Sequence, residues 1–150
     1  MIKTKILILF TILIFIVLSN KLFASESAGI IKYRQNIMKA TAGHMGAIVG
    51  ILKNNLPIKE HIIEHAHSLK KISEMTFNIF PKGSGSGRTK AKKAIWDNWS
   101  KFERVTQDFV DESTKLLEIA KNGNTSAIAK QVRKTGKTCS GCHKNFRKRD

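Results

Sequence analysis

Residues 125–147, TSAIAKQVRKTGKTCSGCHKNFR, carry the helical pattern that decides the fold of this chain. Apolar or small side chains recur there every three or four residues, which places them on one helical face: Ile128, Val132, Thr135, Cys139, Cys142 and Phe146. The preceding Asn122-Gly123 suits a left-handed helix end, and Asn124 or Thr125 can cap the helix that follows. Because an isolated amphipathic helix is marginal in water, this one must pack against others.

Three segments upstream show the same periodicity, at about residues 28–54, 58–79 and 89–121. The breaks between them contain proline or glycine, at Asn54-Asn55-Leu56-Pro57 and at Phe80-Pro81 followed by KGSGSG. No segment has the alternation of a strand. Short connections make successive helices antiparallel neighbours, so the sequence predicts an all-α fold, an antiparallel up-down-up-down four-helix bundle.

Cys139-Ser-Gly-Cys142-His143 is the strongest functional signal in the sequence. C-x-x-C-H is the pattern of covalent c-type haem attachment. Residues three and four apart share a helical face, so both sulfurs and the imidazole can approach one porphyrin. We therefore expect one haem c, joined through Cys139 and Cys142, with His143 as the proximal iron ligand.

Other uses of the two cysteines stay open. A zinc site would make the protein a zinc-binding helical interaction module, but Cys139, Cys142 and His143 then need a fourth ligand, which could be His44, His61, His65 or His67. A thioredoxin-like redox pair belongs after a strand, and none is predicted. A disulfide across two residues would constrain little of the unfolded chain.

The first 24 residues have the order of a secretory signal peptide. Two lysines in residues 1–5 precede an almost unbroken apolar run at 6–18 and a short, more polar stretch at 19–24. That run is short for a bilayer span, which needs about 20 residues. We expect residues 1–24 to be a signal peptide and 25–150 to form one periplasmic domain, with an uncleaved membrane anchor as the alternative.

The chain is strongly basic, with 27 Lys and Arg against 11 Asp and Glu and a formal net charge of +16. Residues 1–24 hold three of the lysines and no acidic residue, so the expected mature domain stays basic. Such a field attracts anionic partners. For an exported protein we expect redox proteins with acidic docking surfaces, or a transient contact with the anionic membrane surface, and no nucleic acid.

Several stretches resemble the class II cytochromes c, the cytochrome c′ and c556 group: YRQNIMK at 33–39, GHMG at 43–46, Ile95-Trp96, and CSGCHKNFR at 139–147. The resemblance covers essentially the whole chain after residue 24. It implies a four-helix bundle with covalent haem. Relatives in this group often pair through their first two helices, which makes a homodimer possible here as well.

The resemblance also implies roles for four residues beyond the attachment motif. Met38 occupies the position that faces the distal side of the haem, where low-spin members have a methionine ligand and five-coordinate members commonly have an apolar residue. Arg34 matches an arginine near a haem propionate. Trp96 is expected to pack near the porphyrin edge, and Arg147 to lie beside the proximal side, close to His143.

Together these features favour a periplasmic monohaem electron-transfer protein, low-spin, with His143 and Met38 as axial ligands. The alternative is a five-coordinate, high-spin cytochrome of the c′ type that binds nitric oxide or carbon monoxide. Two strong axial ligands suit electron transfer because they leave no open iron position. The sequence has no nucleophile with a partnered base and no phosphate loop, so we expect no enzymatic activity.

Overall fold

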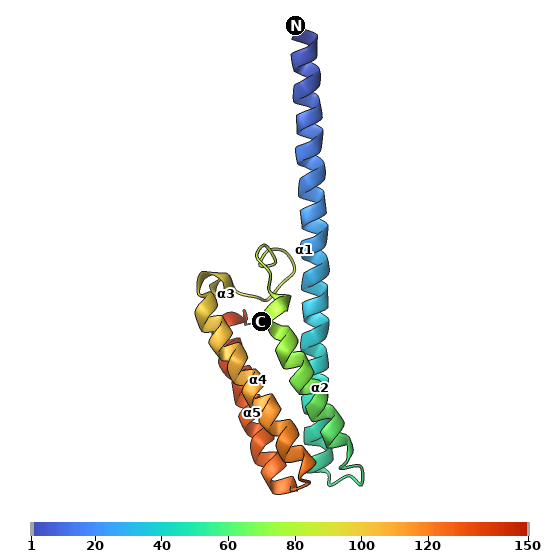
Figure 1. Cartoon of the computed structure of the whole chain (residues 1–150), viewed down its shortest axis with the longest axis vertical. Coiled ribbons are helices and arrows are strands. Elements are labelled where there is room, and N and C mark those ends of the chain that lie inside the picture. Colours follow the sequence, from blue (N-terminus) through green and yellow to red (C-terminus); the bar gives the residue numbers. More distant parts are fainter. Residues whose placement is uncertain (1, 150) are drawn as a thin grey trace.

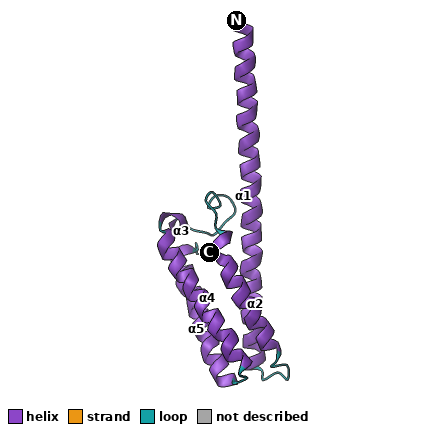
Figure 2. Ribbon diagram, in the orientation of Figure 1, coloured by secondary structure: helices purple, strands orange, loops and turns teal. Residues whose placement is uncertain are grey.

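The computed structural model describes residues 2–149, with side chains described from residue 26 onward. Its elements in chain order are α1 (Ile2–Lys53), α2 (His61–Met75), the 3₁₀-helix η1 (Thr76–Ile79), α3 (Ala94–Asp97), α4 (Trp99–Lys121) and α5 (Thr125–Phe146). Figure 1 shows the four long helices side by side, with α1 extending far beyond the other three. Figure 2 shows the helices joined by loops, with no strand in the described part of the chain.

The four long helices pack as the corners of a square. Helix α1 packs against α2 and α5, and α4 packs against the same two helices, whereas the diagonal pairs do not pack together in the described residues. Each helix therefore buries its apolar stripe against two neighbours, as a bundle requires. The predicted antiparallel four-helix bundle is confirmed.

The predicted second and fourth helices are confirmed with small changes at their ends. Helix α5 begins after Asn124, whose side chain accepts a hydrogen bond from the backbone N–H of Ala127, and Gly123 before it has a positive φ of 70°. The predicted helix 58–79 begins three residues later, at His61, and tightens into η1 over its last turn.

The predicted third helix, residues 89–121, is wrong in its first part. The backbone of Ala91 forms an isolated β-bridge with Arg147, and residues 89–93 lie outside any helix. The helix is also interrupted at Asn98 (φ −137°, ψ 64°), whose side chain accepts a hydrogen bond from Lys101 N–H and so begins α4. Residues 94–97 form the separate short helix α3.

Helix α1 begins at Ile2 and has no break near residue 24. The predicted signal peptide, residues 1–24, falls where side chains are not described, so its role and cleavage stay predictions. Among the residues searched for a membrane span, none of the helices combines the length and hydropathy that crossing a bilayer requires.

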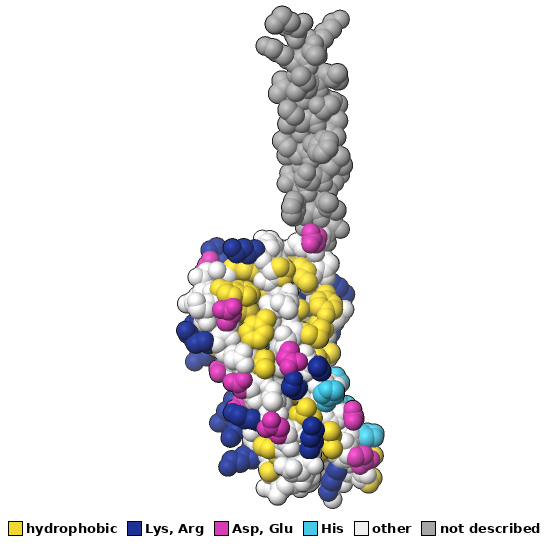
Figure 3. All heavy atoms as spheres, viewed as in Figure 1, with side chains coloured by type: hydrophobic (Ala, Val, Ile, Leu, Met, Phe, Trp, Pro, Cys, Tyr) yellow, Lys and Arg dark blue, Asp and Glu magenta, His cyan; other side chains and the backbone are white. Residues whose placement is uncertain are grey.

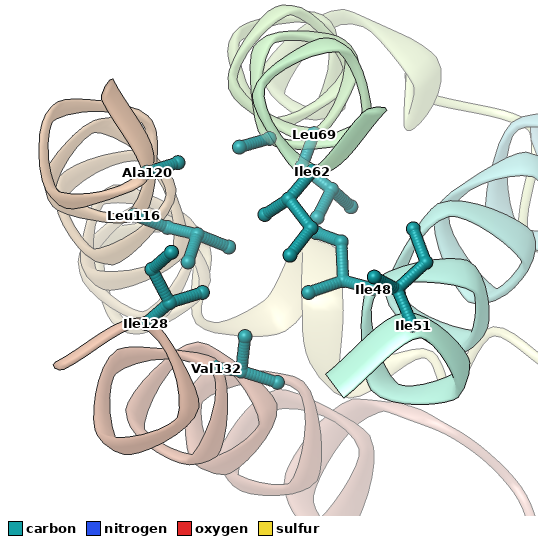
Figure 4. Close-up of a cluster of buried hydrophobic side chains, with 9 residues drawn as sticks. Ile48, Ile51, Ile62, Leu69, Leu116, Ala120, Ile128 and Val132 are labelled. Carbon is teal, nitrogen blue, oxygen red and sulfur yellow. The ribbon is translucent and has the colours of Figure 1, made fainter. Parts of the chain in front are cut away.

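The bundle has two hydrophobic clusters, one toward each end. The aliphatic half lies beside the α1–α2 and α4–α5 turns, and Figure 4 shows its side chains pointing inward from all four long helices; its buried members are Ile48, Ile51, Ile62, Ala66, Leu69, Leu116, Ala120, Ile128 and Val132. The aromatic half lies at the end that contains α3; its buried members are Ile79, Phe80, Ala91, Ile95, Phe102 and Phe146.

A polar joint fixes α5 along α4 between these clusters. Gln131 on α5 donates from Nε2 to the backbone carbonyl of Glu112 (3.0 Å) and to its carboxylate (2.7 Å). Thr135 Oγ1 donates to the same carbonyl at 3.2 Å. The hydrogen bonds from Gln131 and Lys115 hold the pKa of the Glu112 carboxyl below its usual range. The joint sets the register of α5, one turn before Cys139.

Candidate functional site

The two cysteines lie on the last turns of α5, where its buried stripe becomes partly open. Residues Ile128, Val132 and Thr135 on this stripe are buried, whereas Cys139 and Cys142 are half-buried free thiols. Cys142 packs against the aromatic half. Burial raises the pKa of both thiols, that of Cys142 to about 11 with a further contribution from Cys139. Both side chains are therefore protonated thiols at neutral pH.

His143 follows directly and is more exposed than either cysteine. Partial burial of its ring, and then the positive charge of Arg147, lower the pKa of the His143 imidazole. The neutral ring has an unprotonated nitrogen that can bind a metal. The three groups of the motif thus combine two thiols with a metal-binding imidazole on one stretch of helix.

The end of α5 is pinned by residues 90–92. Lys92 N–H donates to the Phe146 carbonyl at 2.9 Å, and Lys148 N–H donates to the Lys90 carbonyl at 2.8 Å. Arg147 N–H caps the helix by donating to the His143 carbonyl at 3.0 Å. Arg147 is exposed and lies close to His143, as the sequence predicts, whereas its role toward a haem stays a prediction.

Aromatic rings line the interior beside the motif. Phe102 is at the centre, with ring centroids 4.9 Å from Phe80, 5.3 Å from Trp99 and 5.5 Å from Phe146. In Figure 3, hydrophobic side chains also gather on the surface of this end of the bundle. A groove of about 540 Å³ between α4 and α5 runs past Cys142 and Val105, and most of its other lining side chains are charged. The apolar surface next to Cys142 therefore comes from the aromatic side chains of this end of the bundle.

Met38 is partly buried and packs against the aromatic half, the cluster that Cys142 also contacts. Met45 packs instead against the aliphatic half, and Met75 is exposed. Of the partly buried methionines with described side chains, only Met38 packs against the aromatic half. This placement agrees with the expected distal position, and iron ligation by Met38 stays a prediction.

Arg34 is buried and clamps the loop that follows η1. Its Nη1 donates to the Ile79 carbonyl (3.1 Å) and Ser84 Oγ (2.9 Å), and its Nη2 donates to the Ser84 carbonyl and Thr89 Oγ1 (both 2.9 Å). The guanidinium also lies 4.7 Å from the ring centroid of Phe80. Four of its five N–H donors are thus used within the protein. The contact of Arg34 with a haem propionate stays a prediction.

Trp96 on α3 is held against the same loop. Its Nε1–H donates to the carbonyls of Phe80 (3.0 Å) and Pro81 (3.2 Å). A side chain at Gly85 would come within 2.7 Å of the indole ring, so only glycine allows the loop this close. The ring borders the aromatic half, and packing at a porphyrin edge remains a prediction.

Sequence reasoning missed Phe80, Ser84 and Thr89. The sequence places Phe80 and Ser84 in the break before the third helix and Thr89 at the start of that helix. No periodicity marks them, because their contacts with Arg34 and Phe102 span more than 20 residues of sequence. The only available signal was composition, since serine and threonine hydroxyls accept hydrogen bonds from arginine well.

The residues present fit a covalent haem. The motif supplies thiols for the two thioether bonds and an imidazole for the iron, beside aromatic side chains that suit a flat macrocycle. The zinc alternative gains no support, because no group of three or more His, Cys, Asp or Glu among the searched residues is arranged to hold a metal ion.

Comparisons with known proteins agree with this site. The family model described as Cytochrome C' matches residues 29–147. The chain is 32% identical to cytochrome c' of Rhodospirillum rubrum over 125 residues, which covers 83% of this chain and 85% of that protein. It is 26% identical to cytochrome c-556 of Agrobacterium tumefaciens, covering 80% of this chain and 98% of that protein.

Solved structures share the fold. A nitric oxide complex of a mutant cytochrome c prime from Alcaligenes xylosoxidans superposes with a TM-score of 0.76 at 26% identity. The match covers 83% of this chain and 97% of that chain. Sequence similarity and structural similarity therefore each cover most of this chain.

Proposed function

This chain belongs to the cytochrome c′ family of class II cytochromes c, and we propose that it is a periplasmic haem protein that binds nitric oxide or carbon monoxide at an open iron position. It carries one covalent haem c, held through Cys139 and Cys142. The proposed role is reversible binding of a small gas, with electron transfer setting the oxidation state.

In this proposal His143, Arg147 and Met38 have different tasks at the haem. His143 supplies the proximal nitrogen, and its partial burial, followed by the charge of Arg147, lowers the pKa of that imidazole and favours its neutral form before the metal binds. Met38 forms part of the apolar lining on the distal side, packed against the aromatic half. When bound, the haem supplies an iron centre with a coordination position and a change of oxidation state.

The observation that carries the proposal is the family match. This chain is 32% identical to a cytochrome c' and 26% identical to a cytochrome c-556. The solved structures with the same fold include a cytochrome c prime in complex with nitric oxide. The apolar residues around Met38 support it further, because a distal pocket of apolar side chains suits a neutral diatomic ligand.

A second candidate is low-spin electron transfer with Met38 bound to the iron opposite His143. Two observations favour it: Met38 and Cys142 both pack against the aromatic half, and a cytochrome c-556 is among the relatives. A thioether ligand would occupy the open position and raise the reduction potential.

Absorption spectra separate the two candidates. The haem-loaded protein, made in a host with haem-attachment machinery, should give high-spin spectra in both oxidation states, and the reduced form should bind carbon monoxide readily. Met38→Ala should leave the spin state unchanged and speed gas binding, since it removes bulk from the pocket. Met45→Ala is the matched control and should change neither property.

A low-spin spectrum that becomes high-spin in Met38→Ala would overturn the gas-binding proposal and establish the second candidate. A low-spin spectrum that persists in Met38→Ala would exclude both, because another side chain would then bind the iron. A colourless protein would contradict every haem assignment.

We further propose that an anionic redox partner docks where the C-terminal segment meets residues 90–92. Lys92 and Lys144 lie together there, since Lys92 Nζ donates to the Lys144 carbonyl at 3.2 Å, and Arg147 is exposed nearby. Reduction by an anionic iron complex should slow as salt is added, and Lys144→Glu should slow it more than Lys130→Glu on the far end of α5. Equal effects of the two substitutions would contradict docking at this end.

A further inference from the structure

His44 on α1 and His65 on α2 face each other across the interface between the two helices. Their Nδ1 atoms are 3.0 Å apart, and their rings are tilted by 54° with centroids 5.2 Å apart. Both side chains are partly buried. His61 and His65 are four residues apart on one helix, a spacing that suits a pair on one face, yet the structure pairs His65 with a histidine 21 residues away.

The pair is separate from the haem site. His44 precedes Met45, which packs against the aliphatic half, and His65 precedes Ala66, a buried member of that half. Figure 3 shows histidine side chains along the edge of the bundle over α2, away from the end where hydrophobic side chains gather on the surface. The cysteines and Met38 lie at that other end.

The contact has the chemistry of a chelate. A neutral imidazole has one protonated nitrogen and one with a free lone pair, so the present contact shares one proton between the two Nδ1 atoms. If that proton moves through solvent to Nε2 of the same ring, both Nδ1 lone pairs are free, and no net proton is released. Two adjacent neutral imidazoles can then bind one metal ion.

The spacing suits such an ion. An ion about 2.0 Å from each Nδ1, the usual zinc–nitrogen distance, would see the two atoms at an angle of about 97°. That angle lies between the roughly 90° of neighbouring ligands in a tetragonal site and the roughly 109° of a tetrahedral one. Burial, and then the charges of His44 and His61, lower the pKa of His65, which favours its neutral, metal-binding form.

We propose that His44 and His65 form a two-histidine site for a divalent transition-metal ion, with water in the remaining positions, that links α1 to α2. Copper is expected to bind most tightly and zinc less so, following the general order of divalent affinities. An ion that binds only the folded chain stabilises it, so the site would also strengthen the α1–α2 contact.

The test is a titration of the haem-loaded full chain with Cu²⁺ and, separately, with Zn²⁺. Calorimetry should give one site, and the copper spectrum in electron paramagnetic resonance should show two nitrogen ligands. Loss of a group that only orients a metal ligand lowers metal affinity by about 10- to 100-fold. Because His44 and His65 are proposed to bind the ion directly, His44→Gln and His65→Gln should each lower the metal affinity by at least about tenfold. The exposed histidines of α2 supply matched controls, and His61→Gln and His67→Gln should bind as the parent does.

Three results would overturn the proposal. No binding to the parent protein would do so directly. Equal affinity in His44→Gln and the parent would place the ion elsewhere, and a loss in His61→Gln without one in His44→Gln would identify a chelate within α2. The haem spectrum of each variant reports folding separately, and the nitrogen count from the parent protein needs no variant at all. Failure here would leave the haem proposal untouched.

Discussion

The two ends of the bundle are packed with different side chains. The aliphatic half takes Ile, Leu, Val and Ala from all four long helices, and Ile48, Leu69 and Leu116 have no exposed surface. The aromatic half is built around Phe80, Phe102 and Phe146, and its neighbours Met38, Trp96, Trp99 and Cys142 remain partly open.

This difference in packing indicates that the aliphatic half supplies stability and that the aromatic half forms the haem site. A closed aliphatic cluster buries its surface with protein alone and supplies stability from the hydrophobic effect. The aromatic half keeps apolar surface accessible beside two thiols, which costs stability in the absence of the haem. We therefore expect substitutions in the aromatic half to change both stability and haem properties, and those in the aliphatic half to change stability alone.

Phe102→Ala should give the largest effect. Its ring is 1% exposed and contacts three other aromatic rings. Its loss should lower the free energy of unfolding by about 3–5 kcal/mol. The visible spectrum of the haem should shift as well, because the lining of its site changes. Chemical denaturation and absorption spectra measure the two effects, and an unchanged spectrum would contradict the assignment of this half to the haem.

Leu116→Ala makes the matching test in the aliphatic half. The side chain is fully buried among residues of four helices, so its loss should cost about 2–5 kcal/mol. The haem spectrum and the rate of carbon monoxide binding should stay as they are. Leu117→Ala, at a partly buried neighbour, is the control and should cost less. A change of the haem spectrum in Leu116→Ala would contradict the expectation that the aliphatic half affects stability alone.

The sequence predicts buried residues correctly where burial follows the spacing of a helix. In the predicted helix 58–79, the helical spacing puts one set of residues on one face, and all of them are buried: Ile62, Ala66, Leu69, Ile72, Thr76 and Ile79. A helix that packs on two neighbours must bury one face. The motif at 139–143 likewise depends only on local spacing. Both could be predicted because the information lies within a few turns of one helix.

The errors arose where tertiary contacts override local preference. Residues 89–93 have the composition of a helix start, yet Ala91 pairs with Arg147, which lies 56 positions further along the chain. The clamp from Arg34 to the loop spans 45 to 55 residues, and the His44–His65 contact spans 21. A single sequence carries no periodic signal for such pairs.

Arg34→Met should have an intermediate effect, because the clamp closes the aromatic half against the loop. The variant leaves the buried acceptors Ile79 O and Ser84 O without their donor, at a cost of about 2–3 kcal/mol. Hydrogen exchange should rise in residues 80–89 and stay low in the aliphatic half. Lys32→Met, on an exposed position of α1, is the control. Uniform exchange changes across both halves would contradict a local clamp.

Ser113→Ala should give the smallest effect, and the opposite sign. Ser113 lies on α4 between Phe102 and Leu116, it is fully buried, and its Oγ has no hydrogen-bond partner. Removing an unsatisfied buried hydroxyl from a helix should raise the free energy of unfolding by about 1 kcal/mol. Ser73→Ala is the matched control, because the equally buried Ser73 Oγ donates to the Lys70 carbonyl at 2.7 Å, so its removal should bring no gain. Thermal unfolding of the two variants measures the difference. If Ser113→Ala is no more stable than the parent, the hydroxyl makes a contact in solution, and the region between the two halves is more polar than its packing indicates.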